Sequence, residues 1–250
     1  MRPVTTVANR LLVWFLAVDA AWLVLDFGVN ALSLQHTGWR SFLGLGYEAN
    51  PPTWWASMLL ALIALCLFVL ASRPFVEHPA VKPLRWGLVG AGAIFTYMSI
   101  DEMGTIHERL SIAMKARYGT AGAHWYVPNL RIFPAWVILW AFLILVVIGL
   151  VVYLPRLYRL WPTEFWIVVP GMVVYTVGAL VLERYAAMIH LTEPTLLFIQ
   201  QGVEETLEMV GPTIVLYGVA RVLFTVAGRC FLTPGVTQPA PKPDRGGSQV

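Results

Sequence analysis

Long runs of apolar residues, separated by short polar segments, make up most of the chain. The runs are continuous and lack the alternation of polar and apolar positions found in outer-membrane barrel strands, so they predict helices. A helix of about 20 apolar residues crosses a bilayer core of about 30 Å. Six runs are long enough, covering residues 9–32, 54–72, 86–112, 132–154, 164–190 and 194–226. We therefore predict an all-α fold, a polytopic membrane bundle of six transmembrane helices.

The composition agrees with a membrane protein. Hydrophobic residues form 58% of the chain and charged residues 12%, with a mean hydropathy of +0.69; a soluble domain has about 45–50% apolar and about 25% charged residues. The first run resembles a signal peptide, but it is too long and contains Asp19 and Asp26, so we interpret it as a transmembrane helix. Prolines and glycines after residue 232 predict disorder. The expected organisation is a transmembrane domain over 1–232 and a disordered cytoplasmic tail over 233–250.

The basic residues indicate the orientation of the bundle. With a cytoplasmic N-terminus, 11 of the 17 Lys and Arg residues fall on the cytoplasmic side, as the positive-inside rule favours. Both termini are then cytoplasmic, and we expect a multi-pass protein of the cytoplasmic (inner) membrane. The net charge of +3 is spread over loops without a basic stripe, so nucleic acid is not expected as a partner. Cys66 and Cys230 are predicted to lie too far apart for a disulfide.

Acidic residues and two histidines lie where three of the apolar segments end. Ionisable groups in membrane spans are costly, and their presence indicates function by default. The predicted topology places all three groups on the outer side of the bilayer. They are Asp101, Glu102, His107 and Glu108 in the third segment, Glu183 and His190 in the fifth, and Glu204, Glu205 and Glu208 in the sixth.

Helical spacing directs these groups toward one level. The three glutamates of the sixth segment fall within an arc of roughly 100°. Asp101 and Glu108 are seven residues apart and share a face if the third helix is regular. A rise of about 1.5 Å per residue puts each group roughly 22–27 Å from the cytoplasmic surface. On the first helix, Asp26 should come close to this level and Asp19 should lie deeper on the same face, so that four helices direct acids to one place.

Seven carboxylates in one region need to be neutralised. The neighbouring bases are Arg109 and Arg184, which leaves about five negative charges uncompensated. Such a state is unfavourable, since burial and nearby like charges both disfavour ionised carboxylates. Two divalent cations and a shared proton would balance them. Oxygen ligands with one or two imidazoles suit Fe or Mn, with Mg or Zn as further options. The sequence therefore predicts a carboxylate and histidine metal site, and we expect Asp101, Glu108 and Glu205 to be its catalytic groups.

These features favour a metal-dependent enzyme that acts on a lipid-soluble or amphiphilic substrate entering from the bilayer. Metal-bound water or oxygen would be the reactive species, and the residue types do not distinguish an oxidoreductase from a hydrolase. One alternative is a proton- or cation-coupled transporter or channel, with Asp19 and Asp26 along the proton path. Another is a structural subunit of a membrane complex. The outer loops over 33–53 and 115–130, with Trp54 and Trp55 nearby, form either an interfacial aromatic belt or a lid.

Overall fold

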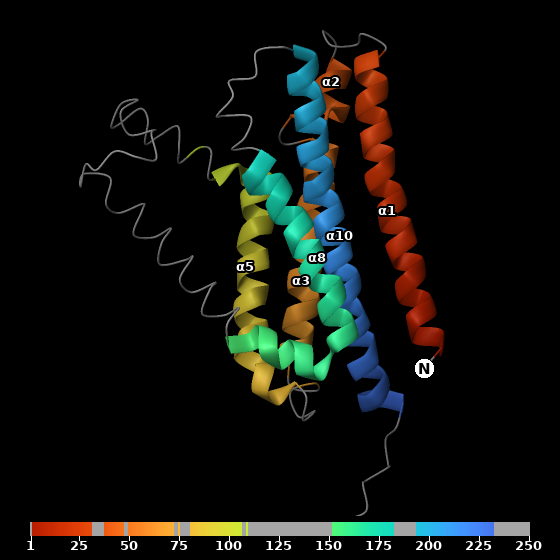
Figure 1. Ribbon diagram of the computed structural model, residues 1–250, viewed down its shortest axis with the longest axis vertical. Coiled ribbons are helices and arrows are strands. Elements are labelled where there is room, and N and C mark those ends of the chain that lie inside the picture. Colours follow the sequence, from red (N-terminus) through yellow and green to blue (C-terminus); the bar gives the residue numbers. More distant parts are fainter. Residues whose placement is uncertain are drawn as a thin grey trace, which may run out of the picture.

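The computed structural model describes residues 2–31, 38–47, 50–72, 75, 81–106, 109, 152–182 and 194–232. All regular elements within these ranges are helical, which confirms the all-α class for this part of the chain (Figure 1). The longer helices are α1 (Arg2–Ala31), α3 (Pro51–Ala71), α5 (Arg85–Gly104), α8 (Pro162–Thr176) and α10 (Pro194–Leu232). The shorter elements are α2 (Gly38–Leu43), the 3₁₀ turn η2 (Lys82–Leu84) and the π-helical segment η5 (Val177–Leu182), and residues 152–160 are also helical.

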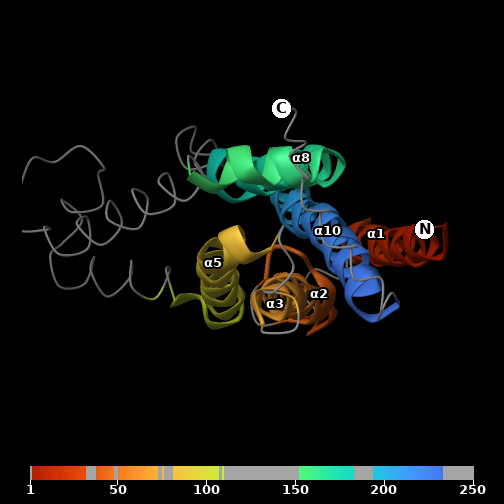
Figure 2. The ribbon, with the colours of Figure 1, turned by 90° about the horizontal axis from the view of Figure 1, so that it is seen from below.

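The helix α10 is the centre of the bundle. It packs against α1, α3, α8 and η5, whereas α5 packs mainly against α3 (Figures 1 and 2). Three helices are long and apolar enough to cross a membrane, over Thr6–Val29, Pro51–Ala71 and Leu196–Gly228, which is compatible with a membrane protein. Most of the fourth expected segment, 132–154, lies outside the described residues. Six spans and cytoplasmic termini therefore stay predictions.

The start of α3 is fixed by local sequence. Asn50 is its N-cap, and the side-chain Oδ1 accepts a hydrogen bond from the backbone N–H of Thr53 at 3.0 Å. Pro51 and Pro52 occupy the first helical positions, where their missing N–H groups cost nothing. The cap also fixes the preceding turn, because the Asn50 amide donates to the carbonyl of Gly44 at 2.6 Å.

The helix α5 ends earlier than the hydrophobic pattern predicts. Thr105 adopts a left-handed backbone conformation with φ of 48°, which closes the helix after Gly104. A regular helix over 86–112 is therefore wrong. The shared face expected for Asp101 and Glu108 depended on that regularity, so the helical argument that paired them no longer holds.

Between α3 and α5, two serines form a reciprocal polar contact. The hydroxyl of Ser57 donates to the backbone carbonyl of Ser99 at 2.8 Å, and the hydroxyl of Ser99 donates to the carbonyl of Ser57 at 2.9 Å. Both side chains are buried. Hydrogen bonds and close packing, more than apolar burial, hold helices together in lipid. The apolar core around this contact and along α10 includes Leu59, Ile63, Leu67, Val215 and Val219.

Glycines allow α8 and α10 to approach closely. A Cβ atom on Gly211 would lie 2.6 Å from the backbone nitrogen of Tyr175, and one on Gly171 would lie 3.0 Å from the carbonyl oxygen of Gly211. Further along the same pair, a Cβ on Gly218 would lie 2.6 Å from a methyl group of Val168. Small residues of this kind let two backbones touch in membrane bundles.

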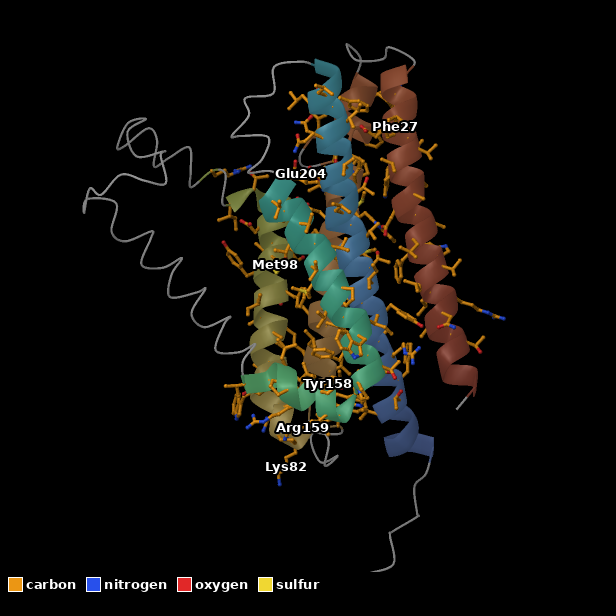
Figure 3. The ribbon with its side chains drawn as sticks, viewed as in Figure 1. Phe27, Lys82, Met98, Tyr158, Arg159 and Glu204 are labelled. Atoms are coloured by element: carbon orange, nitrogen blue, oxygen red, sulfur yellow. The ribbon has the colours of Figure 1, made fainter. Side chains whose placement is uncertain are left out.

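The two ends of the bundle differ in charge. Lys82 and Arg159 lie at the end where α1 begins, and Glu204 lies toward the other end (Figure 3). At the basic end, the helical segment 152–160 runs across the bundle axis (Figure 1). The acid Glu164 at this end is paired with Arg221, with 3.2 Å between Nε and Oε1. The described part of the bundle thus has a basic end and an acidic end.

Part of the first outer loop packs onto the bundle. Leu45, which follows α2, is buried together with Ala56 of α3 and Met209 of α10. The second outer loop, over 115–130, and the tail, over 233–250, lie outside the described residues. The choice between an aromatic belt and a lid is therefore untested.

Candidate functional site

Tyr175 of α8 lies within electrostatic range of acidic residues from two other helices. Asp101 and Glu102 come from the last turn of α5. Glu205 and Glu208 come from α10. All four carboxylates interact electrostatically with the phenol of Tyr175. Such interactions act over roughly 8 Å at physiological salt, so four of the predicted site residues lie in the region of this side chain.

Two glycines bring α10 to this point. At Gly211 the backbone of α10 lies against Tyr175, as described above. At Gly178, in η5, a Cβ atom would lie 3.0 Å from both the carbonyl oxygen of Glu204 and the Cγ of Glu208. The side chain of Glu208 therefore lies against the π-helical segment. π-helical turns are rare and occur frequently at functional sites.

Glu204 makes a different contact from the other two glutamates of α10. Its Oε2 accepts a hydrogen bond from the side-chain amide of Gln200. The same amide nitrogen of Gln200 reaches the carbonyl of Leu182 at 3.4 Å, which connects α10 to the end of η5. The three glutamates predicted to share one arc of α10 thus interact with different groups. Glu205 and Glu208 act electrostatically on Tyr175, and Glu204 accepts a hydrogen bond from Gln200.

Four predicted ligands, His107, Glu108, Glu183 and His190, lie outside the described residues, as does Arg184. Within the described ranges, no group of three or more His, Cys, Asp or Glu side chains is placed to hold a metal ion. The metal site predicted from the sequence therefore depends on ligands from these four positions as well as on the acids around Tyr175.

The two aspartates of α1 are buried inside the bundle, with exposed fractions of 1% for Asp19 and 2% for Asp26. The Oδ1 of Asp19 accepts a hydrogen bond from the indole N–H of Trp55 at 2.7 Å. The Oδ1 of Asp26 accepts one from the backbone N–H of Leu45 at 3.0 Å, and its Oδ2 faces Gly202 of α10. Asp26 is not among the carboxylates that act on Tyr175. Acids were expected to converge from four helices, and within the described residues those that act on Tyr175 come from two helices, α5 and α10.

Three residues that shape these sites have no distinctive sequence signal of their own. Tyr175 is one phenol in an apolar run, Trp55 fits the pattern of an interfacial belt, and Thr213 of α10, which lies beside Asp19, is one hydroxyl near a proline. A usable signal was present in the glycines, which occur in two pairs seven residues apart, at 171 and 178 and at 211 and 218. Such spacing on apolar helices marks a close helix pair, and Tyr175 lies within the first pair.

Comparison with known proteins gives a family and no activity. A family model described as a domain of unknown function (DUF8692) matches residues 11–223, which include every residue of the site described above. Neither a curated protein nor a solved structure matches the chain.

Proposed function

This chain belongs to the DUF8692 family, and we propose that it is a multi-pass integral-membrane enzyme whose acidic end binds a divalent metal ion. The substrate we propose is lipid-soluble or amphiphilic and reaches the site from the bilayer. The observation that supports this proposal best is that Asp101, Glu102, Glu205 and Glu208, from two helices, lie within electrostatic range of the same phenol, that of Tyr175.

Charge balance is the physical argument for a cation. Four carboxylates that lie within range of one phenol repel one another, and partial burial strengthens the repulsion. Arg109 is the described base nearest in sequence to the α5 pair, and its Nε donates to the hydroxyl of Thr105 at 3.0 Å. A divalent ion would relieve the repulsion directly, because it supplies two positive charges at the point where the acids meet.

The donor set suits a hard or borderline metal. Carboxylate oxygens from Asp101, Glu205 and Glu208 would be joined by His107 and His190. This mixture favours Fe or Mn, and Mg or Zn are further options. When bound, such a metal supplies a Lewis acid and a water of lowered pKa. Carboxylates not bound to the metal, including Glu108, would accept protons from the reacting groups.

The proposed topology places this site on the outer side of the membrane. The exposed bases Lys82, Arg85, Arg156 and Arg159 belong to the basic end, which the positive-inside rule assigns to the cytoplasm. The helical segment 152–160 would lie along that surface. Six spans and cytoplasmic termini complete the proposed arrangement, with the fourth span over 132–154.

Metal analysis of the purified protein tests this function. The wild-type protein is expected to hold about one or two metal ions per chain. The double variant Glu205→Gln/Glu208→Gln should lose most of this metal, because it removes two negative ligands and preserves side-chain size. Glu164→Gln is the matched control, since it makes the same chemical change at the basic end and should retain the metal. Equal trace amounts of metal in all three proteins would refute the proposal.

A second candidate function is proton- or cation-coupled transport. Its support is the burial of two carboxylates, Asp19 and Asp26, within a helix long enough to span the membrane. Uptake of a labelled cation or of protons into proteoliposomes would favour transport. A membrane that stays tight to protons and metal ions would exclude it.

A further inference from the structure

A second polar site lies inside the bundle, where α1 meets α3 and α10. Asp19 of α1 is bound on one side only, because its Oδ1 accepts the hydrogen bond from Trp55 of α3. Its other oxygen, Oδ2, is buried without a hydrogen-bond partner. Thr213 of α10 lies beside the Asp19 carboxyl, and its hydroxyl oxygen is also buried without a partner. Both side chains are 1% exposed, so water reaches neither of them from the surface.

The groups around Asp19 offer it no compensating positive charge. On α3 the span Pro51–Ala71 contains no acidic or basic residue, and its one titratable side chain is the thiol of Cys66. On α1 the next acid is Asp26, which binds the backbone of Leu45. On α10 the titratable neighbours of Thr213 in sequence are Glu208, which acts on Tyr175, and Tyr217.

The hydroxyl of Tyr217 is itself engaged. It donates to Oδ1 of Asn9 at 2.6 Å and receives a hydrogen bond from Arg221, whose Nε binds Glu164. The nearest cation on α10 is therefore held at the basic end. An ionised carboxylate at Asp19 could accept from Trp55 and from the hydroxyl of Thr213, but it would be buried without a counter-charge in the described surroundings, which is unfavourable.

We propose that Asp19 binds a proton, and that this proton joins Oδ2 of Asp19 to the hydroxyl oxygen of Thr213. A protonated carboxyl group has one O–H donor and one carbonyl acceptor. The acceptor already receives the indole N–H of Trp55, and the added O–H would satisfy the two oxygens that lack partners. The site is separate from the acids around Tyr175, so this proposal does not depend on metal binding there.

A metal ion fits this position less well than a proton. Ions such as Mg²⁺ and Ca²⁺ require about six or more oxygen ligands, whereas Asp19 and Thr213 offer two. One turn further along α1, the indole N–H of Trp22 is also buried without a partner. An indole N–H donates a hydrogen bond and has no lone pair available, so it cannot be a ligand of a cation.

The proton has a mechanical role because α1 lies at the edge of the described bundle and packs mainly against α10. In the most apolar window of α1, 17% of the residues are buried, compared with 61% in α10. The polar contacts of Asn9, Asp19 and Asp26 therefore carry much of the attachment of α1 to the rest of the bundle. Loss of the proton would leave a charged carboxylate at the centre of this interface and favour separation of α1 from α10.

Infrared spectroscopy of the full-length protein in phosphatidylcholine nanodiscs tests the proposal. At neutral pH the wild type should show a carbonyl band of a protonated carboxyl group that shifts in D₂O and disappears in Asp19→Asn. Asp26→Asn, the same change on the same helix, should retain that band. Thr213→Val should move the band without removing it. If the wild type and Asp19→Asn do not differ in this region, Asp19 is ionised and the proposal fails.

Thermal unfolding provides a second, independent readout. Asn at position 19 can still accept from Trp55 and donate to Thr213, so Asp19→Asn should fold and melt close to the wild type at neutral pH. As the pH rises above about 4, where an exposed aspartate ionises, the wild type should lose stability until the folded carboxyl also ionises, whereas the Asn variant should not. A wild-type protein that is instead stabilised by added Na⁺, with no carboxyl band, would show that the site holds a metal ion and would overturn the proton assignment.

Discussion

Gly211 makes a tight contact with the backbone of α8 at Tyr175, which makes it the sharpest test of this packing. A Cβ atom there would lie 2.6 Å from the backbone nitrogen and 2.8 Å from the Cα of Tyr175. Because these atoms belong to a helix backbone, they cannot rotate away as a flexible side chain can. An ordinary contact of 3.4 Å would require the helices to separate by about 3.4 − 2.6 = 0.8 Å.

The expected cost of Gly211→Ala follows from two opposing terms. Overpacking a tight interior contact costs about 1–3 kcal/mol. Alanine favours the helix over glycine by about 1 kcal/mol, which offsets part of this cost. We expect a net destabilisation of up to about 2 kcal/mol, equivalent to a fall in Tm of up to about 8 °C for a domain of this size. The substitution also moves Tyr175, so metal retention at the acidic end should fall.

Thermal unfolding of the purified protein in detergent measures the effect. Gly228→Ala is the matched control, because it lies on the same helix and a Cβ there meets no atom within 4 Å. The control should melt at or slightly above the wild-type temperature. If Gly211→Ala melts as high as Gly228→Ala, the close approach of α8 and α10 at Tyr175 is not present in the protein.

Three further substitutions test the bundle at separate places. The hydroxyl oxygens of Ser57 and Ser99 also lie 2.9 Å apart, so a double-mutant cycle with Ser57→Ala and Ser99→Ala should give a coupling of about 0.6–1.7 kcal/mol in unfolding free energy, and additive effects would contradict this hydroxyl–hydroxyl contact. Asn50→Ala should destabilise the protein by about 0.5–2 kcal/mol through loss of the α3 cap. Asn50→Ser, which keeps a capping oxygen without placing a second oxygen against the Gly44 carbonyl, should destabilise it less, and equal losses would exclude the cap as the cause. Arg221→Met, which breaks a partly exposed ion pair with Glu164, should change the unfolding free energy by about 1 kcal/mol or less; a much larger loss would indicate that the pair is buried in the membrane-bound protein.

The helical class and the positions of most helices could be predicted from the sequence. Continuous apolar runs of about 20 residues leave the backbone few options other than helices in lipid. The helix start at Pro194 was predicted from proline in the first turn, whereas α3 begins at Pro51, three residues before the predicted segment. The end of α5 could not be predicted in this way, because the left-handed conformation of Thr105 is set by its surroundings and threonine rarely adopts it.

The kinds of residue available to the site were also determined by the sequence alone. Acids at the ends of apolar segments are costly, so their number and types already indicated a need for cations or protons. Which acids meet was decided only by the tertiary structure. Glycines at 178 and 211 set the distance between two helices, and that distance brings Glu208 to Tyr175 while Glu204 turns to Gln200. Asp19 is directed to Trp55 by the packing of α1 on α3, a contact between residues 36 positions apart that no local pattern specifies.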